Sequence, residues 1–189
     1  MKYLIVGLGN IGDEYRNTRH NIGFDILDAF ARASNISFID RRYAYTAEAA
    51  FKGKKFVLIK PTTYVNLSGK AVNYWLQKEK IEIQNLLVIL DDIALPFGTF
   101  RMRAKGGDGG HNGLLNISAV LGTQEYARLR FGIGNNFPQG TQVDYVLGRW
   151  SDEEKKELSA KLEISIEIIR NFALAGLGDT MTRYNRQER

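Results

Sequence analysis

The stretch Leu86-Leu87-Val88-Ile89-Leu90-Asp91-Asp92 places five aliphatic residues directly before two aspartates. An uninterrupted aliphatic run of this length is typical of a strand in the middle of a sheet. In α/β enzymes, functional side chains gather at the carboxyl ends of such strands. The stretch therefore predicts an α/β protein with Asp91 and Asp92 at the edge of the sheet where a site would form.

Strand and helix patterns alternate on the amino-terminal side of this stretch. Residues 2–8 are apolar enough for a buried strand, and glycines at positions 7, 9 and 12 then turn the chain. We expect Thr18 to cap a helix that ends near residues 34–35. The further elements expected here are a hairpin of strands at 43–51 and 55–60 and a helix that opens at 66–69.

On the carboxyl-terminal side, two strands carry alternating cationic residues. Residues 99–105 and 126–133 each alternate apolar and basic side chains, which separates the two kinds onto opposite faces of a strand. The basic positions that this alternation places outward are Arg101, Arg103, Lys105, Arg128 and Arg130. Such a face would suit an anionic partner.

The remaining segments complete the expected architecture. A glycine-rich loop at 106–113 leads into a short helix ended by Gly122, and Ser151 with Glu154 forms a capping box for a helix that runs to about residues 175–176. Strands mixed with helices in this order predict one three-layer α/β domain over residues 1–189. We expect a mixed, mostly parallel twisted sheet with helices on both faces.

Composition and charge narrow the class of protein. With 44% hydrophobic residues among 189, the chain is long enough for one well-buried core. The absence of cysteine excludes disulfides and thiolate chemistry. The apolar start is too short for a signal peptide, and no apolar run approaches the roughly eighteen residues of a membrane span, so we expect a cytoplasmic protein. A net charge of +5 favours an anionic partner such as nucleic acid.

The two histidines, His20 and His111, each stand directly before an asparagine. Because imidazole has an unperturbed pKa close to neutrality, either could serve as a general base. A carboxylate bonded to the far nitrogen would fix the tautomer and support the incoming proton, and Asp91 with His20 suits such a pair. The nucleophile would be water, because the chain lacks cysteine and a serine elbow motif. Polar groups at other strand ends or helix starts that could converge there are Asn10, Asn66 and Asn112.

A dinucleotide-binding oxidoreductase is one alternative. Gly7-Leu8-Gly9-Asn10-Ile11-Gly12 matches the G-x-G-x-x-G fingerprint after a first strand, and Asp40-Arg41-Arg42 follows like a reader of the cofactor ribose or 2′-phosphate. The fingerprint requires its third glycine to open a helix that holds the pyrophosphate. Here residues 13–17, with two carboxylates, separate Gly12 from the expected cap at Thr18. We therefore expect no NAD(P) cofactor.

A metal site is a second alternative. Two histidines and a carboxylate are chemically sufficient ligands for a metal ion. Neither histidine has a partner at the i+2 or i+4 spacing that ligand pairs commonly show. We therefore expect metal-independent chemistry.

Several long motifs follow one another along nearly the full length of the chain. They are Val-Gly-Leu-Gly-Asn at 6–10, Thr-Arg-His-Asn at 18–21, Lys-Pro-Thr-Thr-Tyr-Val-Asn-Leu-Ser-Gly-Lys-Ala-Val at 60–72, Asp-Asp at 91–92, Gly-Gly-His-Asn-Gly-Leu at 109–114 and Arg-Leu-Arg-Phe-Gly-Ile-Gly at 128–134. With these motifs in this order, the chain resembles the bacterial peptidyl-tRNA hydrolase family. The resemblance implies hydrolysis of the ester joining a peptide to the 3′-terminal ribose of tRNA. Free tRNA and peptide would be released after drop-off from the ribosome.

The resemblance also implies roles for particular residues. His20 would be the general base that activates water, Asp91 would stabilise its protonated form, and Asn10 would tell blocked from unblocked aminoacyl groups. The residues implied to bind substrate are Tyr15, Tyr64, Asn66 and Asn112 in the cleft, with Arg103 and Arg130 as a clamp on the tRNA 5′-phosphate. The implied partner is peptidyl-tRNA, met at its acceptor stem and 3′ end. We expect a monomer with no cofactor, no metal and no membrane contact.

The chain departs from the family pattern at a few positions. Val65 stands where methionine is usual, Ile11 where proline is common, Ala94 where aspartate often follows the aspartate pair, and Asp108 at a position that can hold histidine. None of these removes an implied catalytic group. A non-catalytic RNA-binding relative is a third alternative, and the retention of His20, Asp91 and the three asparagines argues against it.

Overall fold

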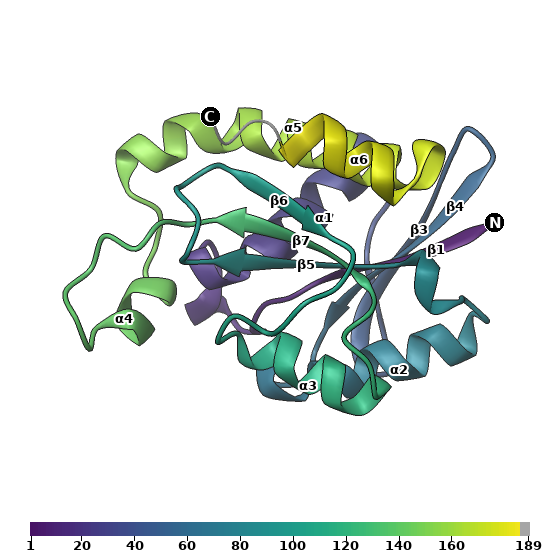
Figure 1. Cartoon of the computed structure of the whole chain (residues 1–189), viewed down its shortest axis with the longest axis horizontal. Helices are drawn as coiled ribbons and strands as arrows, with labels where there is room; N and C mark the ends of the chain where they lie inside the picture. Colours follow the sequence, from purple (N-terminus) through teal and green to yellow (C-terminus); the bar gives the residue numbers. More distant parts are fainter. Residues whose placement is uncertain (186–189) are drawn as a thin grey trace.

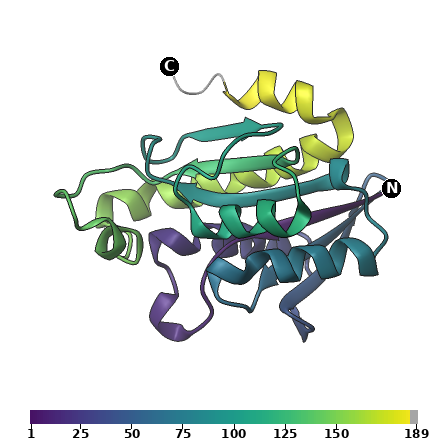
Figure 2. The same cartoon turned by 60° about the horizontal axis from the view of Figure 1, so that its bottom comes forward.

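The computed structural model describes residues 1–185. A seven-stranded mixed sheet runs through the middle of this part of the chain, with helices on both faces (Figures 1 and 2). In order across the sheet, the strands are β2 (Ile39–Arg41), β3 (Ala44–Phe51), β4 (Lys54–Pro61), β1 (Lys2–Gly7), β5 (Leu86–Asp92), β7 (Ala127–Gly132) and β6 (Phe100–Arg103). The central strands β4, β1, β5 and β7 are mutually parallel, and antiparallel strands flank them at both edges. The mixed, mostly parallel sheet expected from the sequence is confirmed.

Two hydrophobic cores lie on opposite faces of this sheet. The helices of one core are α1 (Ile22–Ala33), α5 (Asp152–Ala175) and α6 (Leu177–Tyr184), and those of the other are α2 (Ser68–Lys78) and α3 (Asn112–Leu121). In β5, Leu87 and Ile89 enter the first core while Val88 enters the second, so the strand is buried on both sides. Its aliphatic run, without polar alternation, follows from that burial.

Short helices complete the fold and position loops near the sheet edge. They are the 3-10 helices η1 (Asp13–Tyr15), η2 (Arg19–Asn21), η3 (Val65–Leu67) and η4 (Ile83–Asn85), and the short helix α4 (Gln142–Val146). Figure 1 shows α4 beyond the ends of β5 and β7, away from both helix layers. None of the helices in residues 1–185 combines the length and apolar character that a bilayer crossing needs.

Gly7 and Gly23 bring α1 close to β1. A side-chain carbon added at Gly7 would lie 2.3 Å from the carbonyl oxygen of Gly23, which is far inside van der Waals contact. The first glycine of the fingerprint motif therefore permits close packing of a helix on a strand. This close approach brings the start of α1, and the η2 turn before it, against the sheet.

The structure corrects two expectations. The hydroxyl of Thr18 donates to the carbonyl of Tyr15 instead of capping a helix, and α1 begins only after the η2 turn. Arg128 is fully buried, and its guanidinium donates to the backbone carbonyls of Gly106 and Gln124. Because β7 lies inside the sheet and the glycine loop covers its face there, Arg128 cannot be part of an outward basic surface.

The edge strand β6 is covered near its end by a side chain from the carboxyl-terminal region. The amide of Asn185 accepts from the backbone N–H of Met102 at 2.8 Å and donates to the Met102 carbonyl at 2.9 Å. It thereby satisfies the two groups that a further strand would otherwise pair.

Candidate active site

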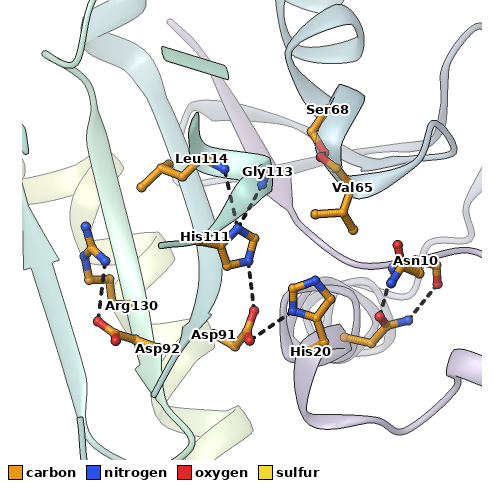
Figure 3. A network of polar contacts seen from close by, with 11 residues as sticks. Asn10, His20, Val65, Ser68, Asp91, Asp92, His111, Gly113, Leu114 and Arg130 are labelled. Atoms are coloured by element: carbon orange, nitrogen blue, oxygen red, sulfur yellow. Dashed lines mark hydrogen bonds and ion pairs between the residues drawn. The ribbon is translucent and has the colours of Figure 1, made fainter. Parts of the chain in front are cut away.

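One buried carboxylate lies between two imidazoles at the carboxyl end of β5 (Figure 3). Asp91 Oδ2 is 3.0 Å from His20 Nδ1, and Asp91 Oδ1 is 3.0 Å from His111 Nε2. The two rings stack with centroids 5.0 Å apart. Three segments far apart in sequence, namely the η2 turn, β5 and the start of α3, therefore supply a single polar cluster.

His111 is held by both of its nitrogens. Its Nδ1 accepts backbone N–H groups from Gly113 at 3.1 Å and Leu114 at 3.4 Å, so the ring caps the amino terminus of α3. A nitrogen that accepts these bonds carries no proton, which places the proton on Nε2, where it is donated to Asp91. The sequence indicated the pairing of Asp91 with His20 and missed this second partner.

One ring nitrogen of His20 is available to accept a proton. Its Nδ1–H donates to Asp91, which leaves Nε2 with its lone pair at a cavity that His20 lines. Burial alone would lower the pKa of His20, but the charge and hydrogen bond of Asp91 outweigh it and raise that pKa above the ordinary value. For the carboxyl of Asp91, burial alone would raise the pKa, but the charges and hydrogen bonds of the two imidazoles hold that pKa well below its usual range. Asp91 is therefore ionised at neutral pH.

The cavity in front of His20 gathers most of the side chains singled out from the sequence. Its volume is about 500 Å³. The predicted residues in its wall are Asn10, His20, Tyr64, Asn66, Asp91, Asn112 and Arg130. The rest of the wall includes apolar side chains, among them Val143 and Leu147 from the α4 region, together with polar groups such as Asp92 and His111. Tyr64 stands at the mouth, with 79% of its surface exposed.

The structure does not bring Tyr15 or Arg103 into the wall of this cavity. Tyr15 ends the η1 turn, where it is half-buried and its carbonyl accepts from Thr18. Arg103 is exposed on β6, opposite Arg128 in the β6–β7 register.

Asn10 is positioned by a residue that sequence reasoning did not single out. Asn21 is buried, and its side-chain oxygen accepts the backbone N–H of Asn10 while its amide donates to the Asn10 carbonyl, both at 2.8 Å. These two hydrogen bonds fix the backbone of Asn10 and do not involve the side-chain amide of Asn10. Asn21 follows His20 directly in sequence, but nothing local indicates a partner eleven residues away.

One of the basic side chains, Arg130, lies beside the cluster in the cavity wall. Arg130 contacts Asp92 Oδ2 at 3.4 Å through Nη1 and donates to the Gly107 carbonyl at 2.9 Å through Nη2. Partial burial and the neighbouring charges of Arg101 and Arg130 lower the pKa of Arg103. The register of β6 and β7 pairs Arg101 with Arg130, so the three arginines share one face of the sheet.

The three groups of the central cluster could also gather round a metal ion, because their ligand atoms lie within 4.8 Å of one another. In the geometry observed, however, each imidazole nitrogen that faces Asp91 makes a 3.0 Å hydrogen bond with it. A metal bound at these atoms would have to displace both of those protons.

The dinucleotide alternative does not fit the observed loop. Gly12 leads into the short η1 turn, with exposed Asp13 and Glu14 in it, rather than into a helix that could hold a pyrophosphate. The α-helix begins only at Ile22. The NAD(P)-binding reading is therefore not favoured.

Comparison with known proteins agrees with the geometry. The family model for peptidyl-tRNA hydrolase matches residues 4–189. The chain is 59% identical to a peptidyl-tRNA hydrolase of Phocaeicola vulgatus and 58% identical to one of Bacteroides fragilis, each across 99% of this chain and 100% of the relative. A solved peptidyl-tRNA hydrolase from Acinetobacter baumannii superposes with a TM-score of 0.90 at 29% identity, covering 97% of this chain and 94% of that chain. The chain belongs to the peptidyl-tRNA hydrolase family.

Proposed function

We propose that His20 is the general base in the hydrolysis of peptidyl-tRNA by this chain. The bond cleaved is the ester between the peptide, or an N-blocked aminoacyl group, and the 3′-terminal ribose. One observation carries the assignment: Nδ1 of His20 is bonded to the ionised Asp91 while Nε2 is left at the cavity. A base oriented by a buried carboxylate in this way is suited to take a proton from water.

The reaction runs in two steps. A water molecule attacks the ester carbonyl as Nε2 of His20 takes its proton, and the carbonyl carbon becomes tetrahedral with a negatively charged oxygen. The intermediate then collapses, the bond to the ribose oxygen breaks, and His20 returns the proton to that oxygen. Asp91 stabilises the transient imidazolium throughout, since its charge is 3.0 Å from Nδ1.

Neutral amides hold the reacting groups. Asn66 and Asn112 line the same cavity as His20 and can position the water and donate to the developing oxyanion. Asn10 distinguishes blocked from free α-amino groups, an assignment supported by its rigid placement through Asn21. Tyr64 at the mouth contacts the substrate, and Tyr15 contributes from outside the cavity wall.

The tRNA is held at its acceptor stem and 5′-phosphate by Arg103 and Arg130. The exposure of Arg103 and the net charge of +5 support this assignment. Arg130 meets Asp92 only at 3.4 Å, a long contact that a phosphate can replace. The single-domain organisation of residues 1–189, a monomeric state and a cytoplasmic location stay predictions.

The purified protein tests the function directly. It should release N-acetylated amino acid from N-acetyl-aminoacyl-tRNA and leave unblocked aminoacyl-tRNA largely intact. Exhaustive EDTA treatment should preserve most of this activity, because imidazole rather than a metal activates the water. Loss of activity that added zinc restores would contradict the metal-independent mechanism, and no release at all would contradict the function.

A further inference from the structure

The two amides assigned to the water and the oxyanion come from different elements. Asn66 lies in the η3 turn, which leads into α2, and Asn112 is the first residue of α3. The two helices lie side by side on one face of the sheet (Figures 1 and 2). Because both amides act on one tetrahedral centre, their separation must be held, and it depends on how α2 and α3 are joined.

The η3 turn is fixed to the start of α2. The buried hydroxyl of Ser68 donates to the carbonyl of Val65 at 2.7 Å, and both residues are labelled in Figure 3. The backbone N–H of Leu67 donates to the carbonyl of Tyr64 at 2.8 Å. Asn66 lies between these residues in the chain, so its backbone follows any displacement of the first turn of α2.

Asn116 joins this turn to α3. Its side-chain oxygen accepts the backbone N–H of Gly69 in the first turn of α2 at 2.8 Å. Leu67, at the amino-terminal cap position of α2, makes no such side-chain bond. The neighbouring helix therefore supplies the partner that a helix start needs. Asn116 follows Asn112 by about one helical turn, so this bond holds the end of α3 that carries Asn112.

Glycines allow the two elements to approach closely beside this bond. A side-chain carbon added at Gly69 would lie 2.8 Å from the backbone oxygen of Asn116, and one added at Gly113 would lie 3.0 Å from Cγ1 of Val65. Gly113 and Val65 are the chain neighbours of the two cavity asparagines. A small shift between α2 and α3 is therefore passed to both amides.

We propose that Asn116 is a positioning residue for the hydrolysis, because its bond to Gly69 sets the separation of Asn66 and Asn112. The inference rests on the proposed function and deepens it, since Asn116 lies outside the wall of the cavity and acts through residues in it. Interactions that matter only in the transition state change kcat and spare KM.

Two substitutions at position 116 separate the acceptor from the rest of the side chain. Asn116→Leu keeps about the same shape and removes the acceptor, whereas Asn116→Asp keeps an acceptor at the amino terminus of α2, where negative charge is favourable. Ser118→Ala is the matched control, since the Ser118 hydroxyl also makes a bond from α3, at 2.7 Å to the hydroxyl of Tyr126. Thermal unfolding reports whether each variant folds, and hydrogen exchange at the Gly69 amide reports the bond itself without a substrate.

Asn116→Leu should lower kcat on N-acetyl-aminoacyl-tRNA on the order of three- to tenfold, keep KM within about twofold and speed exchange at the Gly69 amide. Asn116→Asp should keep kcat and KM within about twofold of the unchanged protein. Ser118→Ala should spare kcat even where its melting temperature falls as far. In an Asn66→Ala background, which is itself slow, Asn116→Leu should lower kcat no further, because no second amide is left to align.

An undiminished effect of Asn116→Leu in that background, an equal loss of kcat from Ser118→Ala, or no recovery in Asn116→Asp would overturn the positioning role. Unchanged kcat or unchanged exchange in Asn116→Leu would also overturn it. All of these results leave the proposed function intact as long as the unchanged protein hydrolyses the substrate. No hydrolysis by the unchanged protein would contradict the function itself, and the positioning role with it.

Discussion

Identical side chains at positions 20 and 111 do different work because their nitrogens face different groups. Both rings bond to Asp91, but His111 uses its other nitrogen to cap α3 while that of His20 is left at the cavity. His20→Ala should therefore lower kcat by about 10²–10⁴-fold and leave tRNA affinity nearly unchanged. His111→Ala should be milder, because it removes a cap and one bond to Asp91. Single-turnover rates and filter binding measure both, and equal losses would contradict the assignment.

The pH profile follows from the raised pKa of His20. A general base works only when unprotonated, so kcat/KM should fall as the pH drops through that pKa, which lies above the ordinary histidine value of about 6.5. In Asp91→Asn the carboxylate charge is gone and burial acts alone, so the acid limb should shift to lower pH and the rate should also fall. An unchanged limb in pH–rate measurements would show that another group titrates.

The contribution of His20 to folding stability depends on pH in the opposite direction to its contribution to kcat/KM. The folded protein binds this proton more readily than the unfolded chain, so the contribution is present below the unfolded histidine pKa and is lost as the pH rises through the raised one. Asp91 contributes in the other direction. Its stabilisation holds above the unfolded aspartate pKa of about 4 and is lost as the pH falls through its very low folded pKa.

At the scale of elements, Arg19 ties the α4 wall of the cavity to the turn that carries His20. Its guanidinium lies 4.2 Å from the ring centre of Tyr145, donates to the Tyr145 carbonyl at 3.1 Å and pairs with Glu154 at 2.9 Å. Its backbone N–H donates to Gly148. A lysine cannot stack and bridge two acceptors at once.

Arg19→Lys should therefore raise KM about threefold or more, while kcat stays within about twofold, because a loosened α4 wall weakens substrate contact without touching the base. Arg16→Lys is the matched control, since Arg16 makes only an exposed pair with Asp13. Steady-state kinetics on one substrate separates the two parameters. A fall in kcat with unchanged KM would mean that Arg19 acts on His20 itself.

Elements with local signals were predictable from the sequence. The hairpin of β3 and β4 turns at Lys52 and Gly53, both with positive φ, and the capping box of Ser151 and Glu154 forms as expected. The short elements β2, α4 and α6 were not predicted. The helix α6 packs against both α5 and β6, and its eight residues follow α5 after the single residue Gly176, so the end of α5 was recognised but the start of a second, short helix was not.

The residues of the site also fall into those that could be predicted from the sequence and those that could not. The resemblance to a family named His20, Asp91 and the asparagines, and the ends of strands and helices explained why they could meet. The roles of Asn21 and His111 depend on the crossing of distant segments, which sequence spacing does not encode. The burial of Arg128 was misjudged because strand alternation tells the two faces apart but does not tell whether a loop covers one of them.

At the scale of the whole molecule, the arginines of β6 and β7 should set how binding responds to salt. Arg103→Ala and Arg130→Ala should each weaken tRNA binding and reduce the slope of log affinity against log salt by roughly one phosphate contact. If both arginines hold the 5′-phosphate, the effects of the two substitutions on tRNA affinity should be non-additive. Both effects should nearly disappear on tRNA that lacks this phosphate.

Lys155→Ala is the control for this series, because Lys155 is an exposed cation of α5, on the other face of the sheet. Binding titrations at several salt concentrations give the slopes, and kcat at saturating substrate should be spared. Unchanged slopes and KM in both arginine variants would leave these residues as solvated surface charges.

The contact between Asn185 and Met102 also limits how the chain can be engineered. Cutting the protein before residue 185 would free the N–H and carbonyl of Met102 on an edge strand, and open strand edges template intermolecular pairing. A truncated variant could keep His20 and its cavity and still precipitate during expression. An affinity tag is therefore better appended after residue 189 than substituted for the last residues of α6.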